Sequence, residues 1–138
     1  MRWTLVFLLS LFGLAMAVAT VYAIVPSNVA QLFWLPIILI SAYVIAVRAG
    51  GRFFTYRLAV GIANSFWITV IHGLFVETFM ANNPQETAML ASMPLPHRPR
   101  LMMALVGPLV GVVSGAIIGI LAVLAAWMFG RRAPRPNA

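Results

Sequence analysis

The stretch 107–119, GPLVGVVSGAIIG, carries a glycine at every fourth position of an otherwise apolar run. Residues four apart lie on nearly the same face of an α-helix, so these glycines form a shallow groove along one side. In lipid, such a groove lets a second backbone approach closely, and van der Waals contact then drives the association. The stretch therefore predicts a membrane helix that packs on a partner through Gly107, Gly111, Gly115 and Gly119.

The composition of the whole chain excludes an ordinary soluble domain. Of the 138 residues, 63% are hydrophobic and 8% are charged, whereas a soluble domain has about 25% charged residues. A chain of this length forms one domain, and no polar segment is long enough for a separate soluble enzyme domain. We therefore expect a single transmembrane domain over residues 1–138.

Apolar runs predict an all-α, integral membrane four-helix bundle. The runs cover about residues 3–25, 30–47, 58–80 and 101–129, and a span needs about 20 apolar residues. Pro36 falls inside the second run, because the piece after it is too short to cross the membrane alone. The first run resembles a signal peptide in its flanks, but its length favours a retained helix.

The third connection predicts a short amphipathic helix over residues 84–92. Asn83 is a suitable helix cap, Pro84 suits the first helical position, and Glu86 stands at the capping-box position. Such a helix would lie at the outer membrane surface. A plain ordered loop is the alternative.

Charge placement predicts the orientation of the spans. All nine basic residues are arginines, and seven of them fall on one side if the N-terminus is cytoplasmic. The positive-inside rule then places both termini in the cytoplasm. This placement also explains the net charge of +7 without nucleic-acid binding. The arginines that we expect to set topology and attract lipid headgroups are Arg48, Arg52, Arg57, Arg131, Arg132 and Arg135.

Small residues recur at the same spacing of four in the third apolar run. They are Gly61, Ser65, Thr69 and Gly73. One loop joins this run to the fourth, so the simplest expectation is that the two helices pack along these faces. The alternative is that the glycine face of the fourth helix, a glycine zipper, joins separate subunits. Either interpretation concerns packing and predicts no chemical activity.

A polar path is the second hypothesis for the third run. Polar side chains are costly inside a membrane, and Asn64, His72 and Glu77 fall within or near this span. On a helical wheel, Asn64 and His72 lie about 80° apart, whereas Glu77 lies about 140° from His72. We favour interhelical hydrogen bonds that fix the packing. A proton or cation path with a titrating His72 is the alternative.

Catalytic and metal-binding patterns are absent from the sequence. Serines in the apolar runs lack the histidine and acid neighbours that activate a nucleophile. Cysteine is absent, and His72 and His97 are the two histidines, so no metal-ligand motif is present. We expect no catalytic residues, no metal site and no cofactor.

The second half of the chain resembles a group of small uncharacterised bacterial inner-membrane proteins with four predicted helices, a domain of unknown function. The resemblance rests on the 83–96 run from Asn-Pro to Pro-Leu-Pro, on Pro99 to Met103, and on Gly107-Pro108 with the glycines that follow. It implies a bacterial inner-membrane location but no activity or substrate. Small multidrug exporters of similar length carry an acidic residue early in the chain, and the first run here has none.

These patterns lead to one main functional expectation. The chain is a non-catalytic integral membrane protein that packs or oligomerises through small-residue faces. Its partners are the lipid bilayer and either a second copy or another membrane protein, not nucleic acid. A small transporter or channel subunit with a polar path along the third helix is the alternative, and a membrane-embedded enzyme ranks third.

Overall fold

A computed structural model describes residues 2–48 and 50–130, except for the side chains at 122, 125, 126 and 128–130. The predicted headgroup contacts of Arg131, Arg132 and Arg135 therefore lie outside the described residues. Within them the chain is helical and contains no strand. The helices are α1 (Trp3–Val21), α2 (Ser27–Arg48), α3 (Phe53–Leu74), α4 (Val76–Asn82), α5 (Pro84–Ala91) and α6 (Pro99–Gly130).

Four of these helices, α1, α2, α3 and α6, are long and apolar enough to cross a membrane. The predicted all-α fold with four candidate spans is thus confirmed. The sidedness of the termini and a surface position for α5 stay predictions. Helices α2, α5 and α6 begin and end within a few residues of their predicted bounds.

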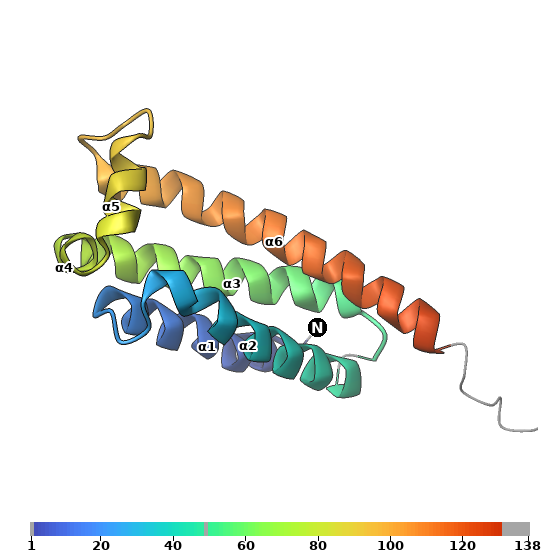
Figure 1. Ribbon diagram of the computed structural model, residues 1–138. Coiled ribbons are helices and arrows are strands. Elements are labelled where there is room, and N and C mark those ends of the chain that lie inside the picture. Colours follow the sequence, from blue (N-terminus) through green and yellow to red (C-terminus); the bar gives the residue numbers. More distant parts are fainter. Residues whose placement is uncertain (1, 49, 131–138) are drawn as a thin grey trace, which may run out of the picture.

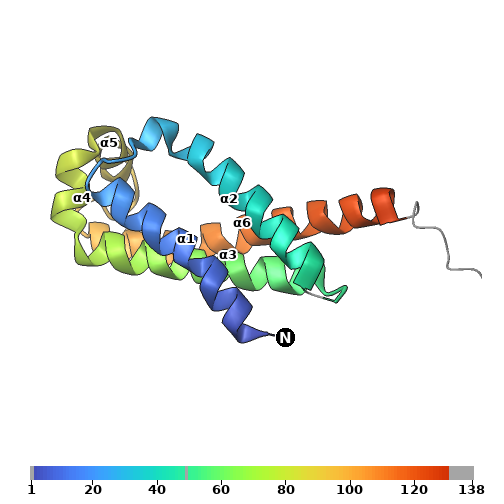
Figure 2. The ribbon, with the colours of Figure 1, turned by 90° about the horizontal axis from the view of Figure 1, so that it is seen from below.

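Helix α3 is the centre of the bundle. It packs extensively against α6 on one side and against α1 on the other, and the short helices α4 and α5 lie across one end (Figure 1). Helix α2 touches α1 and α3 only sparsely. Figure 2 shows α2 leaning away from the other spans toward its N-terminal end. The fold is therefore a tightly packed three-helix unit with a loosely attached fourth span.

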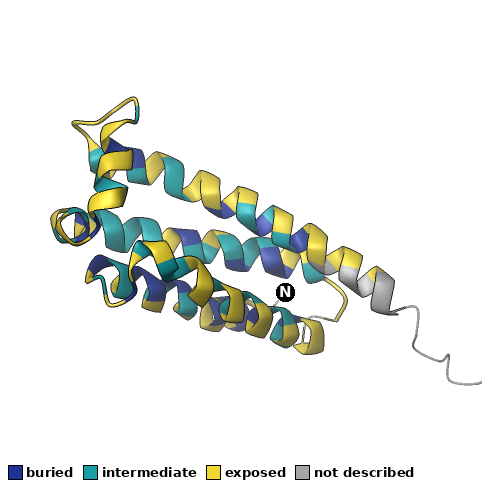
Figure 3. Ribbon diagram, in the orientation of Figure 1, coloured by how far each residue is buried: buried dark blue, intermediate teal, exposed yellow. Residues whose placement is uncertain are grey.

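Burial follows this arrangement. Buried residues line the faces where the spans meet, whereas the outer faces of α2 and α6 are largely exposed (Figure 3). The exposed side chains on these outer faces are mostly large and apolar, which suits contact with lipid tails. The main buried cluster, near the N-terminal end of α1, consists of Leu5, Val6, Leu9, Ile45, Tyr56 and Val60.

Helix α1 ends at Val21 instead of the predicted Val25, because the chain adopts a left-handed turn there. Ala23 has a φ of 51°, and the amide of Ile24 donates to the Ala19 carbonyl at 2.9 Å. The amide of Ala23 donates to the Thr20 carbonyl at 3.2 Å. This pair of bonds is the Schellman motif, which glycine usually occupies at its left-handed position. With alanine in that place, the sequence carried no stop signal before Pro26.

Helix α3 begins at Phe53 and ends at Leu74, whereas the prediction placed it over residues 58–80. The chain bends at Phe75, and α4 then runs across the end of the bundle. This bend lets Phe79 stack on His72, with ring centroids 4.2 Å apart. The sequence prediction missed the bend because no proline or glycine stands at residue 75.

The end of α1 is held by two asparagines. The amide of Asn82 donates to the Val21 carbonyl at 3.1 Å, and that of Asn83 donates to the Thr20 carbonyl at 2.8 Å. Asn83 also donates to the Phe79 carbonyl at 2.9 Å. The predicted cap role of Asn83 for α5 is therefore wrong, because its side chain donates to carbonyls of α1 and α4 instead.

Candidate functional site, a cavity between three spans

The glycine face of α6 lies against the small-residue face of α3. Where the two backbones meet, a Cβ on Gly61 would lie 2.8 Å from the Cα of Gly115 and 3.2 Å from the Gly111 carbonyl oxygen. Along the interface, Gly107 lies against Thr69, Gly111 against Ser65, Gly115 against Gly61 and Leu58, and Gly119 against Phe54. The glycine face is thus occupied within one chain.

Ser65, Thr69 and Gly73 of α3 differ from one another in how they meet α6. Ser65 donates its hydroxyl to the Gly107 carbonyl. The buried Thr69 hydroxyl has no hydrogen-bond partner among the described residues. No atom lies within 4 Å of a Cβ built on Gly73, although the Gly73 carbonyl accepts a hydrogen bond from Arg100 Nε of α6 at 3.1 Å. Of the predicted α3 positions, Gly73 is therefore the one that plays no part in close packing.

A cavity of about 590 Å³ lies between α2, α3 and α6. Its size falls within the range of about 300–1,000 Å³ that is usual for small-molecule sites. Helix α2 forms one wall without packing on α6, and the α3–α6 pair forms the other. Most of the lining is apolar, with Ile37, Val110 and Ile118 as examples, and a few polar groups stand among them.

Arg57 is the charged group of this cavity. Its side chain is only 5% exposed, and Nη2 donates to the Ile38 carbonyl of α2 at 3.0 Å. Its Nε has no partner among the described residues. Ile38 lies about 15 Å along α2 from Arg48, which is roughly half the depth of a hydrocarbon core of about 30 Å. The expectation that Arg57 reaches lipid headgroups in a loop is therefore wrong, because α3 begins early enough to carry it inside.

Two further polar groups of the cavity lack hydrogen bonds. The Ser41 hydroxyl on α2 and the Asn64 Oδ1 on α3 are buried without a partner among the described residues. The Asn64 Oδ1, however, lies against Gly13 of α1, 2.6 Å from the position of a Cβ, so it faces the α1–α3 contact and not the cavity. A buried polar atom without a partner costs about 1–3 kcal/mol, so a polar group bound in this cavity would stabilise the Arg57 Nε and the Ser41 hydroxyl.

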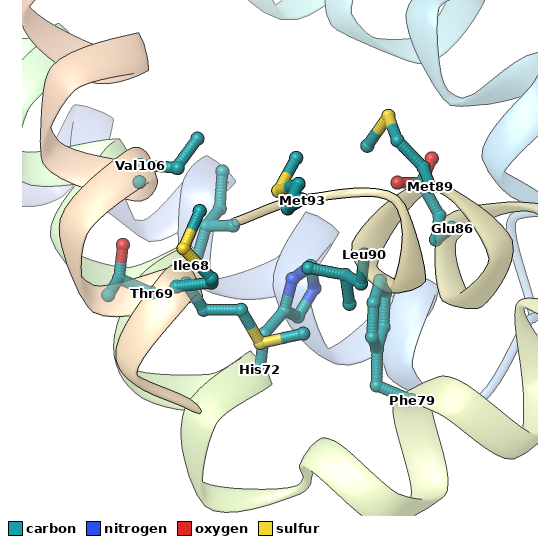
Figure 4. Close-up of a pocket in the computed structure, with 12 residues that line it drawn as sticks. Ile68, Thr69, His72, Phe79, Glu86, Met89, Leu90, Met93 and Val106 are labelled. Carbon is teal, nitrogen blue, oxygen red and sulfur yellow. The ribbon is translucent and has the colours of Figure 1, made fainter. Parts of the chain in front are cut away.

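His72 lies at a second, smaller cavity of about 150 Å³, toward the α4–α5 end of the bundle. Figure 4 shows its ring stacked beside Phe79, with Met93 and Val106 on the cavity wall. His72 Nε2 lies 2.9 Å from the Thr20 hydroxyl, which is also 2.9 Å from the Met16 carbonyl. The hydroxyl has one proton for that carbonyl, so the arrangement favours His72 as the donor to Thr20. His72 therefore joins α3 to α1.

The three residues of the predicted polar path do not meet. Asn64 lines the large cavity, His72 lines the small one, and Glu77 lies exposed on α4. The two cavities do share a wall, because Ile68 and Gly107 line both. A path along α3 would therefore run from the Arg57 region to His72 without Glu77.

Comparisons with protein-family models, with curated proteins and with solved structures gave no match for this chain.

Sequence reasoning missed Arg57 and Ser41 as cavity residues. Arg57 follows Phe53, Phe54 and Tyr56, and an aromatic cluster of this kind is also typical of a helix that has already entered the membrane interface. This aromatic cluster therefore indicates that Arg57 lies within the helix and not in the loop before it. Ser41 gave no signal, because a lone serine in an apolar span usually bonds its own helix.

Proposed function

We propose that this chain is a non-catalytic, multi-pass membrane protein that binds an amphiphilic guest between α2 and the α3–α6 pair. The observation that carries this proposal is the cavity of about 590 Å³ between three candidate spans, whose wall holds polar atoms without a partner among the residues that the structure describes. The packing role expected for the small-residue faces supports it, since those faces hold α3 and α6 together as one rigid wall.

The experiment is native mass spectrometry of the protein extracted in a mild detergent. We expect a retained amphiphile on the wild-type chain and its loss in Val110→Phe, which fills the cavity. Leu109→Phe is the matched control, because Leu109 is also exposed but does not line the cavity. The proposal fails if the wild type retains nothing, or if both variants retain the amphiphile equally.

We further propose a bacterial inner-membrane location with both termini cytoplasmic. Arg48 and Arg52 lie exposed at the α2–α3 connection, whereas Arg98 and Arg100 lie at the other end, before and within the first turn of α6. The positive-inside rule supports this orientation. The resemblance to small bacterial inner-membrane proteins supports the location. Reporter fusions at Gly50 and at Leu95 test this orientation. The reporter at Gly50 should lie in the cytoplasm, and the reporter at Leu95 should lie outside.

A small transporter is the second candidate, and the shared wall of the two cavities favours it. Its test is proton flux into vesicles that contain the purified protein and a trapped pH-sensitive dye. Transport predicts a flux that falls in His72→Ala while the helical content and the melting temperature stay close to wild type. If His72 serves packing alone, His72→Ala should have a lower melting temperature than the wild type. Neither protein should then show proton flux.

A further inference from the structure

We propose that the guest of the large cavity is an amphiphilic anion whose acidic group pairs with Arg57. The shared chemistry is a carboxylate or phosphate oxygen attached to an aliphatic chain, as in a fatty acid or an anionic phospholipid. This inference rests on the proposed guest-binding function and names the class of the guest.

The chain holds no acidic side chain near Arg57. A charge buried in a low-dielectric region needs an opposite charge or a full set of hydrogen bonds. The two acidic residues of the whole sequence are Glu77 and Glu86. They lie on α4 and α5, across the end of the bundle opposite the α2–α3 connection near Arg57. The chain therefore supplies no acid to Arg57.

Arg57 has more hydrogen-bond donors than the surrounding helices use. A guanidinium has five N–H groups in a planar fork, which suits two oxygens of one carboxylate or phosphate. Here the bond to the Ile38 carbonyl uses Nη2, and Nε has no partner in the part of the chain that the structure describes. The Ser41 hydroxyl on the facing helix, 2% exposed and also unpartnered, is a further donor at the same cavity. These groups point to an acceptor with several oxygens.

The rest of the cavity wall is mostly apolar. Ile37 and Ile38 of α2 face Val110 and Ile118 of α6 across it, and Val60 lies on the α3 side. A small hydrophilic ion would leave this surface without a partner, whereas an aliphatic chain would cover it. Because α2 and α6 hardly touch, such a chain can enter sideways from the lipid. The combination of one buried cation with an apolar slot selects an anionic amphiphile.

Trp34 provides the measurement, because it lines this cavity. The full chain is placed in phosphatidylcholine vesicles, and tryptophan quenching is titrated with brominated phosphatidylglycerol, brominated phosphatidylcholine or dibromostearate. The difference between the wild type and Trp34→Phe isolates the Trp34 signal. The two anionic probes distinguish a phosphate guest from a carboxylate guest.

We expect wild-type Trp34 to prefer at least one anionic probe over phosphatidylcholine, and Arg57→Gln to weaken that preference by about tenfold to a hundredfold. Arg57→Lys should keep part of it, since the charge remains. Arg48→Gln, which removes an exposed charge that we expect to attract headgroups at the same end of the bundle, should weaken it much less than Arg57→Gln does.

Three outcomes would overturn the inference. One is equal quenching by anionic and zwitterionic probes, and another is a preference that survives in Arg57→Gln. The third is a preference that Arg48→Gln removes as strongly, because surface attraction would then explain it. If mass spectrometry finds a neutral guest that Val110→Phe displaces, the anion inference fails while the proposed guest-binding function stands.

Discussion

Gly61 of α3 and Gly115 of α6 meet backbone to backbone, so that a Cβ on Gly61 would lie 2.8 Å from the Gly115 Cα. The reverse contact is looser, because a Cβ on Gly115 has its nearest atom at 3.4 Å. The two glycines face each other, but a Cβ on Gly115 would have more space than a Cβ on Gly61. A methyl group should therefore be costly at one position and harmless at the other.

We expect Gly61→Ala to lower the free energy of unfolding by about 1–3 kcal/mol, because the rigid backbone of α6 must shift. Gly115→Ala is the matched control and should change it by less than about 0.5 kcal/mol. Thermal unfolding of both variants in one detergent makes the comparison. Equal effects of the two substitutions would contradict this account of the interface.

The left-handed turn after α1 offers a stabilising substitution. Alanine at φ 51° is strained, by about 1–2 kcal/mol for an L-residue in this region. Ala23→Gly removes that strain but gives the unfolded chain more freedom, so we expect a net gain of about 0.5–1 kcal/mol. Ala19→Gly, inside α1, should instead cost about 1 kcal/mol. A lower melting temperature for Ala23→Gly would show that the turn is not left-handed.

Asn83 should control the closed end of the bundle. The residue is 3% exposed and its amide satisfies the carbonyls of Thr20 and Phe79. Asn83→Leu leaves both carbonyls without this donor, and we expect a loss of about 2–3 kcal/mol. Hydrogen exchange should rise in residues 19–25 and 79–87. Asn82→Ala removes one bond at an exposed residue and should cost about 1 kcal/mol. A larger effect from Asn82 than from Asn83 would refute this assignment.

Much of the fold follows from local sequence patterns. Apolar length fixes the candidate spans, because each span must satisfy its own backbone within lipid. The helix ends were less predictable where the stop depends on tertiary contacts. Alanine occupies the turn at residue 23, and the bend at Phe75 has no breaking residue, since distant partners stabilise it. His72, Phe79 and the asparagine bonds to α1 hold α4 in place, and none of these pairs is visible along the sequence.

The site was less predictable than the fold, for a physical reason. Small residues at a spacing of four indicate a face, but they do not say which helix covers it. Arg57 was assigned to a loop because positive charge near a span usually marks its cytoplasmic end. Its burial depends on α3 starting at Phe53 and on the Ile38 carbonyl of α2. The cavity itself arises from α2 leaning away, a long-range feature with no local signal.

Helix α2 should be the mobile wall of the cavity, because it has few contacts with its neighbours and its best polar anchor is the Arg57–Ile38 bond. The chain has no cysteine, so a spin-label pair can be added on a natural background. Labels at Leu35 on α2 and Leu109 on α6, both exposed, report the distance between these two walls of the cavity. Labels at Phe66 on α3 and at Leu109 are the reference, since these two helices pack closely.

We expect electron–electron distance measurements in nanodiscs to give a broader distribution for the α2–α6 pair than for the α3–α6 pair. Arg57→Gln should broaden the α2–α6 distribution further, because it removes the bond that holds the middle of α2. The α3–α6 distribution should not change, since the Arg57 hydrogen bond joins α3 to α2 and not to α6. Equal widths for the two pairs in the wild type would mean that α2 is fixed, and the guest would then need another route into the cavity.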